Sequence, residues 1–155
     1  MKKVISFITV ITFITIISFV LYACKNKAAK TSAASAPVIA DSAKLNGNWQ
    51  MNYITGATSF DSLYPAKIPA INFDVVAKKI SGNTGCNSFS GKLVTEGNKI
   101  SFADPMIMTK MFCPGDGEPL FLQNLQKVET YLIVNDTTLN FMMGEIAIMK
   151  FAKKP

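Results

Sequence analysis

The stretch INFDVVAKKISGNTGCNSFSGKL, residues 71–93, decides the fold class of this 155-residue chain. Apolar and polar side chains alternate in it, and a lysine pair and a glycine-rich segment divide it into three runs. Alternation with a period of two is typical of a β-strand with one buried face, and both dividing segments are typical of turns. The stretch therefore predicts three consecutive antiparallel strands.

The same rhythm continues on both sides of this stretch. Upstream, Trp49, Met51 and Tyr53 alternate with polar residues, which predicts a strand with an aromatic inner face. Downstream, alternation returns at residues 100–102 and again between residues 131 and 151. We expect seven or eight strands in all.

One segment departs from this period. Phe121, Leu125 and Val128 are spaced i, i+4 and i+7, and Pro119 suits a first helical turn. We expect a helix of about three turns whose apolar face covers an open part of the sheet. The predicted fold class is mainly β (α+β), an antiparallel curved sheet or small barrel with one inserted helix.

The N-terminus has the pattern of an export signal. Two lysines precede an uncharged, apolar run over residues 4–23, which ends in Leu21-Tyr22-Ala23-Cys24. This end resembles a bacterial lipobox, so residues 1–23 are predicted to be a lipoprotein signal peptide and Cys24 the lipidated residue. The run is also long enough for an uncleaved transmembrane helix, which is the alternative.

Residues 24–43 are rich in Ala, Ser and Lys, and we expect them to form a flexible tether that is held to a membrane by acyl chains such as palmitate on Cys24. Residues 44–155 are the predicted globular domain. Because Lys25 and not aspartate follows the cysteine, we expect a lipid-anchored protein of the cell envelope, at the outer membrane and facing the periplasm.

The charge of the chain argues against one class of partner. Its formal net charge is +6, every basic residue is a lysine, and the lysines are scattered. Specific recognition of bases and phosphates relies mainly on arginine. We therefore expect no binding to nucleic acid.

Two cysteine motifs now stand in a fixed order: GCNSFSG at 85–91, and MTKMFC at 108–113 followed by Glu118 and the predicted helix. With GNW at 47–49 and LNF at 139–141, they resemble the META-domain family, the HslJ-like heat-shock lipoproteins of bacterial envelopes. This resemblance implies a compact, mostly antiparallel β domain with one helix, often lipid-anchored. It also implies an association with envelope stress and no established enzymatic activity.

Cys86 and Cys113 are left as an even pair once Cys24 carries lipid. In an oxidising compartment such a pair is expected to form a disulfide, and free buried thiols are the alternative. A cysteine nucleophile would need a nearby base, and the chain has no histidine. Ser88 and Ser90 meet the same shortage, which leaves only an unusual Ser-Lys arrangement, so we expect no enzyme and no catalytic residue.

Metal binding is the other class of site to weigh. Met106, Met108, Met111 and Cys113 form a series of soft ligands that would suit copper(I), so a copper-binding or copper-responsive lipoprotein is the alternative function. Methionine more often fills irregular cores, and we expect no metal and no cofactor.

Asn87 is expected to hydrogen-bond the backbone of its own turn. The predicted function is a non-enzymatic envelope lipoprotein that binds or supports an envelope protein or a small ligand.

Overall fold

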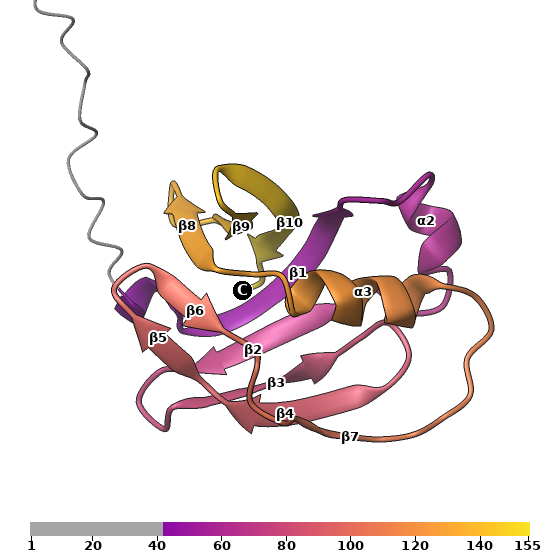
Figure 1. Ribbon diagram of the computed structural model, residues 1–155, viewed down its shortest axis with the longest axis horizontal. Helices are drawn as coiled ribbons and strands as arrows, with labels where there is room; N and C mark the ends of the chain where they lie inside the picture. Colours follow the sequence, from indigo (N-terminus) through magenta and orange to yellow (C-terminus); the bar gives the residue numbers. More distant parts are fainter. Residues whose placement is uncertain (1–41) are drawn as a thin grey trace, which may run out of the picture. The chain divides into compact units, whose positions relative to one another are not determined.

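The computed structural model describes residues 42–155 (Figure 1). The predicted signal peptide, the predicted lipidation site Cys24 and the tether up to residue 41 lie outside the described residues. Ser42 and Ala43, the last two residues of the predicted tether, open the 3-10 helix η1 (Ser42–Leu45). Within residues 42–155, no helix combines the length and the apolar character needed to span a membrane.

A single antiparallel sheet dominates the described part of the chain. Its strands are β1 (Gly47–Ile54), β2 (Ala70–Asp74), β3 (Lys79–Asn83), β4 (Ser88–Lys92), β5 (Val94–Glu96), β6 (Lys99–Ser101), β7 (Ile107–Met108), β8 (Thr130–Val134), β9 (Thr138–Met143) and β10 (Ile146–Lys153). They are arranged in the order β5-β6-β8-β9-β10-β1-β2-β3-β4-β7. The predicted fold class, mainly β and antiparallel, is confirmed.

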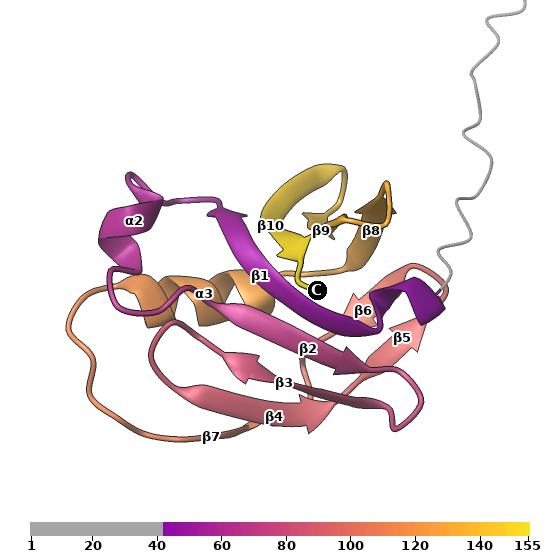
Figure 2. The same ribbon diagram turned by 180° about the vertical axis from the view of Figure 1, so that it is seen from behind.

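The sheet is strongly curled, as its connectivity requires. β4 lies next to one end of the strand order and β5 lies at the other end, yet only Leu93 separates them in the chain. The sheet must therefore bend until its two end regions approach each other, and Figures 1 and 2 show the resulting half-barrel. Strand twist favours such curling in a sheet of this width.

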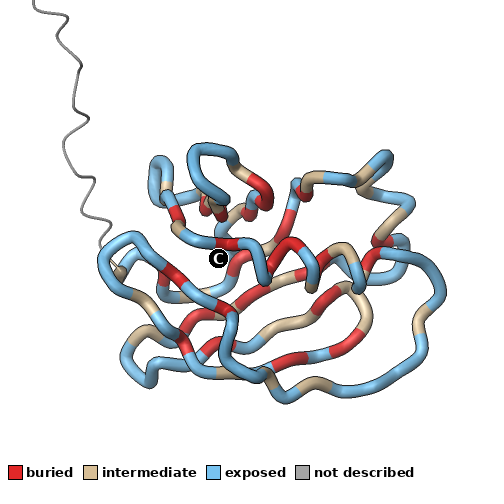
Figure 3. Tube along the Cα trace, viewed as in Figure 1, coloured by how far each residue is buried: buried red, intermediate tan, exposed pale blue. Residues whose placement is uncertain are grey.

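The concave side of the half-barrel holds the core. Alternate strand residues are buried, while most connecting loops are exposed (Figure 3). Aromatic side chains fill the centre: the ring of Phe141 lies 6.4 Å from that of Phe73 and 5.1 Å from that of Phe151. Burial of these large apolar surfaces is the main stabilising term for the fold.

The predicted inserted helix is present as α3 (Gly117–Leu125), and a single short turn of helix, α2 (Phe60–Leu63), precedes it in the chain. Phe121 on α3 is fully buried, and its ring lies 6.1 Å from that of Phe89 on β4. α3 therefore closes part of the open side of the sheet (Figure 2). The helix is shorter than predicted, since it ends at Leu125. Val128, which was expected on its apolar face, is buried but lies after the helix.

Two expectations about the strands were wrong. The sheet has ten strands instead of the expected seven or eight. β5 and β7 were not predicted, because they are too short to produce an alternating pattern in the sequence. Tyr53 is not on the inner face: a bulge in the pairing with β10 follows Met51, so that Ile54 is buried and Tyr53 is 42% exposed. A bulge adds one residue to a strand and reverses the face of all that follows.

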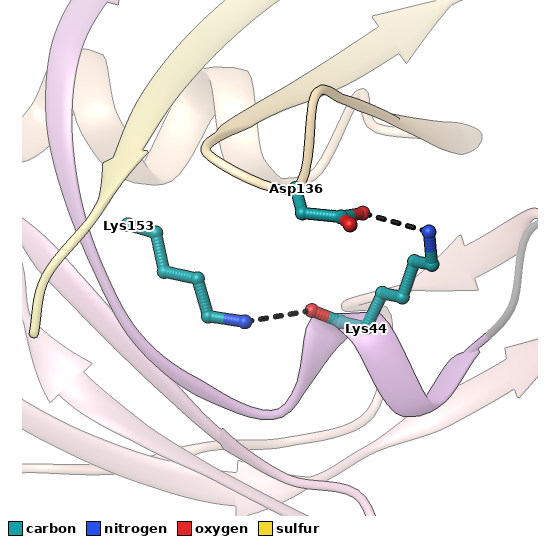
Figure 4. A network of polar contacts seen from close by, with 3 residues as sticks. All are labelled: Lys44, Asp136 and Lys153. Atoms are coloured by element: carbon teal, nitrogen blue, oxygen red, sulfur yellow. Dashed lines mark hydrogen bonds and ion pairs between the residues drawn. The ribbon is translucent and has the colours of Figure 1, made fainter.

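The start of the domain is fixed to its end by a small polar network. Lys44 on η1 forms an ion pair of 2.7 Å with Asp136 in the β8–β9 turn, and the Lys153 ammonium donates to the Lys44 carbonyl oxygen at 3.4 Å (Figure 4). Lys153 also lies over the ring of Trp49, 5.2 Å from its centroid. These contacts attach η1 to β1, β10 and the β8–β9 turn.

Candidate functional site

A disulfide between Cys86 and Cys113 ties the β3–β4 turn to the segment that leads into α3. The two Cα atoms are 6.0 Å apart and the sequence separation is 27 residues. The structure thus brings together the two cysteines for which a crosslink was expected. Because both sulfur atoms are bonded to each other, neither is available as a thiolate nucleophile or metal ligand.

Asn87, directly after Cys86, forms the centre of a polar cluster. Its side-chain oxygen accepts hydrogen bonds from the Met111 amide at 2.7 Å and from the Thr109 hydroxyl at 2.8 Å. Its side-chain amide donates to the Met111 carbonyl oxygen at 3.1 Å and to Glu118 Oε2 at 2.9 Å. Asn87 is 3% exposed, whereas Thr109 and Met111 are exposed, so these bonds lie at the boundary between the interior and solvent.

Thr84 supplies the second half of this cluster. Its hydroxyl donates to Glu118 Oε1 at 2.7 Å and accepts from the backbone amides of Asn87 at 3.0 Å and Cys86 at 3.3 Å. Asn87 was expected to stabilise its own turn, and this was wrong: Thr84 does so, while Asn87 reaches across to the loop before α3. Both oxygens of the Glu118 carboxylate therefore accept a hydrogen bond within the fold.

Tyr64 packs against the β3–β4 turn and the start of α3, next to the Asn87 cluster. Its ring packs against Gly85 and Gly117, where an added Cβ would come within 2.6 Å and 2.8 Å of ring carbons. Its hydroxyl donates to the Gly117 carbonyl oxygen at 2.8 Å, and burial raises the pKa of Tyr64 to about 12. The side chain therefore stays protonated at physiological pH and acts as a fixed spacer beneath the turn.

The loop that this framework holds, residues 109–116, displays apolar side chains to solvent. We call it the 109–116 loop. Phe112 is 94% exposed and Met111 is 61% exposed, although the backbone of Met111 makes two hydrogen bonds to Asn87. Met111 and Phe112 are adjacent in the sequence, so the loop exposes two neighbouring apolar side chains on a hydrogen-bonded backbone.

A groove of about 650 Å³ runs between this loop and α3. Its lining is mostly apolar, with Asn87, Thr109, Lys110 and Glu118 as its polar members; the apolar members are Met108, Met111, Phe112, Pro119 and Leu122. It is open at the surface and borders the disulfide and the Asn87 cluster. Its composition suits an apolar side chain with a neighbouring polar or anionic group.

The methionines of the soft-ligand series lie in two different environments. Met106 and Met108 are partly buried and pack against the core, whereas Met111 is mostly exposed on the 109–116 loop. Cys113, the last member, is in the disulfide. Among residues 42–155, no group of three or more His, Cys, Asp or Glu side chains is placed to hold a metal ion.

The remaining candidate nucleophiles, Ser88 and Ser90, make no side-chain hydrogen bond to a lysine or a carboxylate among residues 42–155, although Ser90 lines a surface hollow together with Lys79 and Lys92. Ser88 and Ser90 are exposed on β4, where the Ser88 amide donates to the Thr109 hydroxyl. Lys110 and Asp116 are exposed on the 109–116 loop. The cluster of Thr84, Asn87 and Glu118 is suited to fixing the 109–116 loop in position, because its polar side chains hydrogen-bond within the fold.

No role was predicted from the sequence for Thr84, Thr109 or Tyr64, and Glu118 was noted only as part of the second cysteine motif. A threonine three residues before Asn87 was a usable signal, since its hydroxyl commonly caps such a turn. The link from Asn87 to Glu118 had no signal, because the two are 31 residues apart. Only the fold places them in contact.

A curled antiparallel β domain with one inserted helix and a disulfide-fixed loop beside that helix defines the class of protein. The META-domain family profile matches residues 42–155, the whole described part of the chain. The chain belongs to the META-domain family, as its two cysteine motifs predicted. No curated protein matches this sequence.

Two solved structures share the fold. The NMR structure of a protein from Burkholderia xenovorans superposes with a TM-score of 0.56 at 17% identity, and the match covers 73% of this chain and 87% of that one. The crystal structure of a DUF4847 family protein from Bacteroides vulgatus gives a TM-score of 0.51 at 13% identity, with 72% and 96% covered. Identities this low establish a common fold and nothing about function.

Proposed function

We propose that this META-domain protein is a non-enzymatic, lipid-anchored component of the bacterial cell envelope. It acts by binding, in support of another envelope component under stress, and its contact surface is the 109–116 loop with the adjoining groove. Cys24 is the proposed anchor, and the proposed location is the outer membrane, facing the periplasm. No nucleic acid takes part.

The observation that carries the proposal is the exposure of Phe112 on a loop whose backbone is attached to the fold on both sides of this residue. The loop is fixed by the disulfide at Cys113 and by Asn87 at Met111. A mobile loop would fold such side chains inward, since burial of a phenylalanine ring is worth about 2–3 kcal/mol. A framework that keeps the ring in water is what a preformed binding surface requires.

The chemistry of the groove suggests the kind of partner. Methionine side chains adapt to irregular apolar shapes, and two of them, Met108 and Met111, line the groove together with Leu122. Lys110 and Glu118 both line the groove. Because the Glu118 carboxylate already accepts two hydrogen bonds within the fold, the Lys110 ammonium is the charge left for a partner. An extended segment of an envelope protein with an apolar side chain beside an acidic one fits these features.

The non-enzymatic assignment is supported by the state of the candidate catalytic groups. The cysteine sulfurs are bonded to each other, and the Glu118 carboxylate accepts from Thr84 and Asn87. Tyr64 is protonated because burial raises its pKa. Labelling with broad serine- and cysteine-directed probes should give no adduct; specific labelling of Ser88 or Ser90 would overturn the assignment.

The copper(I) alternative stays a prediction without a supporting contact. The partial burial of Met106 and Met108 against the core favours their role in packing. Titration with copper(I) separates the two: equal affinity of the wild type and of Met106→Leu/Met108→Leu excludes a site built on this series.

Photo-crosslinking in intact cells tests the contact surface. A photoreactive phenylalanine analogue at position 112 should give one dominant adduct. The same analogue at Ile146, which is 64% exposed at the start of β10 and lines no proposed surface, is the control and should give none. Adding Asn87→Ala should weaken the adduct at 112, because the disulfide alone then holds the loop; equal adducts at the two positions would refute the proposal.

The anchor has its own test. Metabolic labelling with an alkyne-bearing fatty acid should mark the wild-type protein and leave Cys24→Ser unmarked. Labelling of the Cys24→Ser variant would exclude this cysteine as the site of lipidation.

A further inference from the structure

A second surface lies away from the 109–116 loop, on the convex outer face of β2, β3 and β4. It forms a hollow of about 790 Å³ that extends from the β2–β3 turn to Pro105 and Ile107 at β7. Its polar lining contains hydroxyl, amide and ammonium groups and one carboxylate, that of Asp74, and the rest is aliphatic, with no aromatic side chain. The binding surface proposed above uses none of these residues.

The floor of the hollow is a polar row that crosses the sheet in register. Asn72 pairs with Ser81, Ser81 pairs with Ser90, and Ser90 pairs with Ile107 at the sheet edge. Asn72 is oriented by donating to the Asn48 side-chain oxygen at 2.6 Å. Ser81 and Ser90 are exposed, and their hydroxyls make no hydrogen bond to another residue between 42 and 155, so both are available as donors and acceptors.

A second row, of charged residues, lies on the same face of the sheet, two residues along each strand from the polar row. Lys79 pairs with Asp74 on one side and with Lys92 on the other, and Lys78 adjoins them in the turn. Asp74 is partly used, since it accepts from the Ala77 amide at 2.8 Å. None of these three lysines forms an ion pair with another residue between 42 and 155, and like charges directly opposite in a sheet are unfavourable. A bound anion would reduce the repulsion between Lys79 and Lys92.

We propose that this outer face binds a phosphorylated saccharide. The phosphate lies between Lys79 and Lys92, and the sugar hydroxyls bond to Ser81 and Ser90. Ile107 contacts the less polar edge of the sugar. Lysine binds phosphate as a point charge, and side-chain hydroxyls and amides are the groups that hydrogen-bond sugar hydroxyls.

Two other classes of anionic ligand fit the face less well. A nucleotide would need an aromatic or arginine plane on which its base stacks, and the hollow has neither. A bare phosphate would leave the row of Asn72, Ser81 and Ser90 unused. The same sugar phosphate can be a soluble molecule or the headgroup of a phosphorylated glycolipid, and the experiment separates these sources.

The test is an amide-shift titration of the full chain in micelles of a neutral polyoxyethylene detergent. The soluble probes are glucose 1-phosphate, inorganic phosphate and glucose, and a phosphorylated glucosamine glycolipid added to the micelles is the headgroup probe. Glucose 1-phosphate should shift the amides of Lys79, Ser81, Ser90 and Lys92 and bind about tenfold more tightly than inorganic phosphate, and glucose should not bind. A tighter response to the glycolipid assigns the headgroup as the source, and a tighter response to glucose 1-phosphate assigns the soluble sugar phosphate.

Variants locate the site. Lys79→Gln and Lys92→Gln should each weaken glucose 1-phosphate binding about tenfold, the loss expected for one charge-assisted hydrogen bond. Ser81→Ala/Ser90→Ala should weaken glucose 1-phosphate but leave inorganic phosphate unchanged. Lys127→Gln removes an exposed lysine that lines neither the hollow nor the groove, and it should change nothing. Absence of binding by every phosphorylated probe, equal binding of inorganic phosphate, or equal losses in Lys127→Gln would overturn the proposal.

Discussion

Replacing Asn87 by alanine removes the residue that joins the β3–β4 turn to the 109–116 loop and to α3. The substitution eliminates the bonds to the Met111 amide, the Met111 carbonyl, the Thr109 hydroxyl and the Glu118 carboxylate. Three of these bonds are between neutral groups, each worth about 1 kcal/mol net, and the bond to the carboxylate is worth about 2 kcal/mol. The sum is about 5 kcal/mol.

The expected loss is smaller than this sum, because water can reach the backbone of the exposed Met111 and replace part of what is lost. We expect the free energy of unfolding to fall by about 3–4 kcal/mol, against a total of about 5–15 kcal/mol for a domain. Urea unfolding of the oxidised protein measures it. Asn140→Ala is the control, because Asn140 makes one long side-chain bond of 3.5 Å and should lose less than about 1 kcal/mol.

A loss below about 1 kcal/mol in Asn87→Ala would refute the idea that this side chain organises the loop. Asn87→Asp adds a sign test, since it places a second carboxylate beside Glu118 at nearly unchanged volume. Like charges raise the pKa of one carboxyl group in the folded state, so stability is lost as pH rises through the folded pKa. The variant should therefore regain stability relative to wild type near pH 4, and a constant difference between pH 4 and 7 would contradict the reasoning.

Three further predictions concern the surroundings of Asn87. Replacing both Cys86 and Cys113 by alanine should cost about 3.5 kcal/mol by the loop-closure relation for a sequence separation of 27, measured by urea unfolding; no loss would mean that the loop is held without the crosslink. Because the folded-state pKa of Tyr64 is about 12 against 10.0 for an exposed tyrosine, stability should fall between pH 10 and 12, and a Tyr64→Phe variant should show a shallower fall in that window. Gly85→Ala should cost at least about 1–2 kcal/mol more than Gly115→Ala, since both glycines have φ +94 but only Gly85 faces the Tyr64 ring; equal losses would show that the ring moves aside.

The strands were predictable where local alternation decides burial. Ile71, Phe73, Ile80 and Phe89 all face the core as their spacing indicated, because a one-residue slip would expose the whole set. The burial of Tyr53 was mispredicted because the bulge depends on pairing with β10, which is a property of the folded sheet. No local pattern records the register of a distant partner.

The candidate site likewise has one part that the sequence predicted and one part that depends on the folded sheet. The disulfide followed from the number of cysteines and the expected compartment, both of which are visible in the sequence. The contacts of Asn87 with Met111 and Glu118 depend on how the sheet curls, since they join residues 24 and 31 positions apart. The exposure of Phe112 was likewise unpredictable, because an apolar residue beside a cysteine is more often buried.

The central claim is that the 109–116 loop is a fixed surface that presents its apolar side chains to a partner. Hydrogen exchange at the Met111 amide tests it most directly, because this amide donates to Asn87 at 2.7 Å while its side chain is exposed. The account predicts strong protection in the oxidised wild type, at least about a hundredfold slower exchange than in the unfolded chain, and its loss in Asn87→Ala. Exchange of the wild-type Met111 amide at the unprotected rate would contradict it.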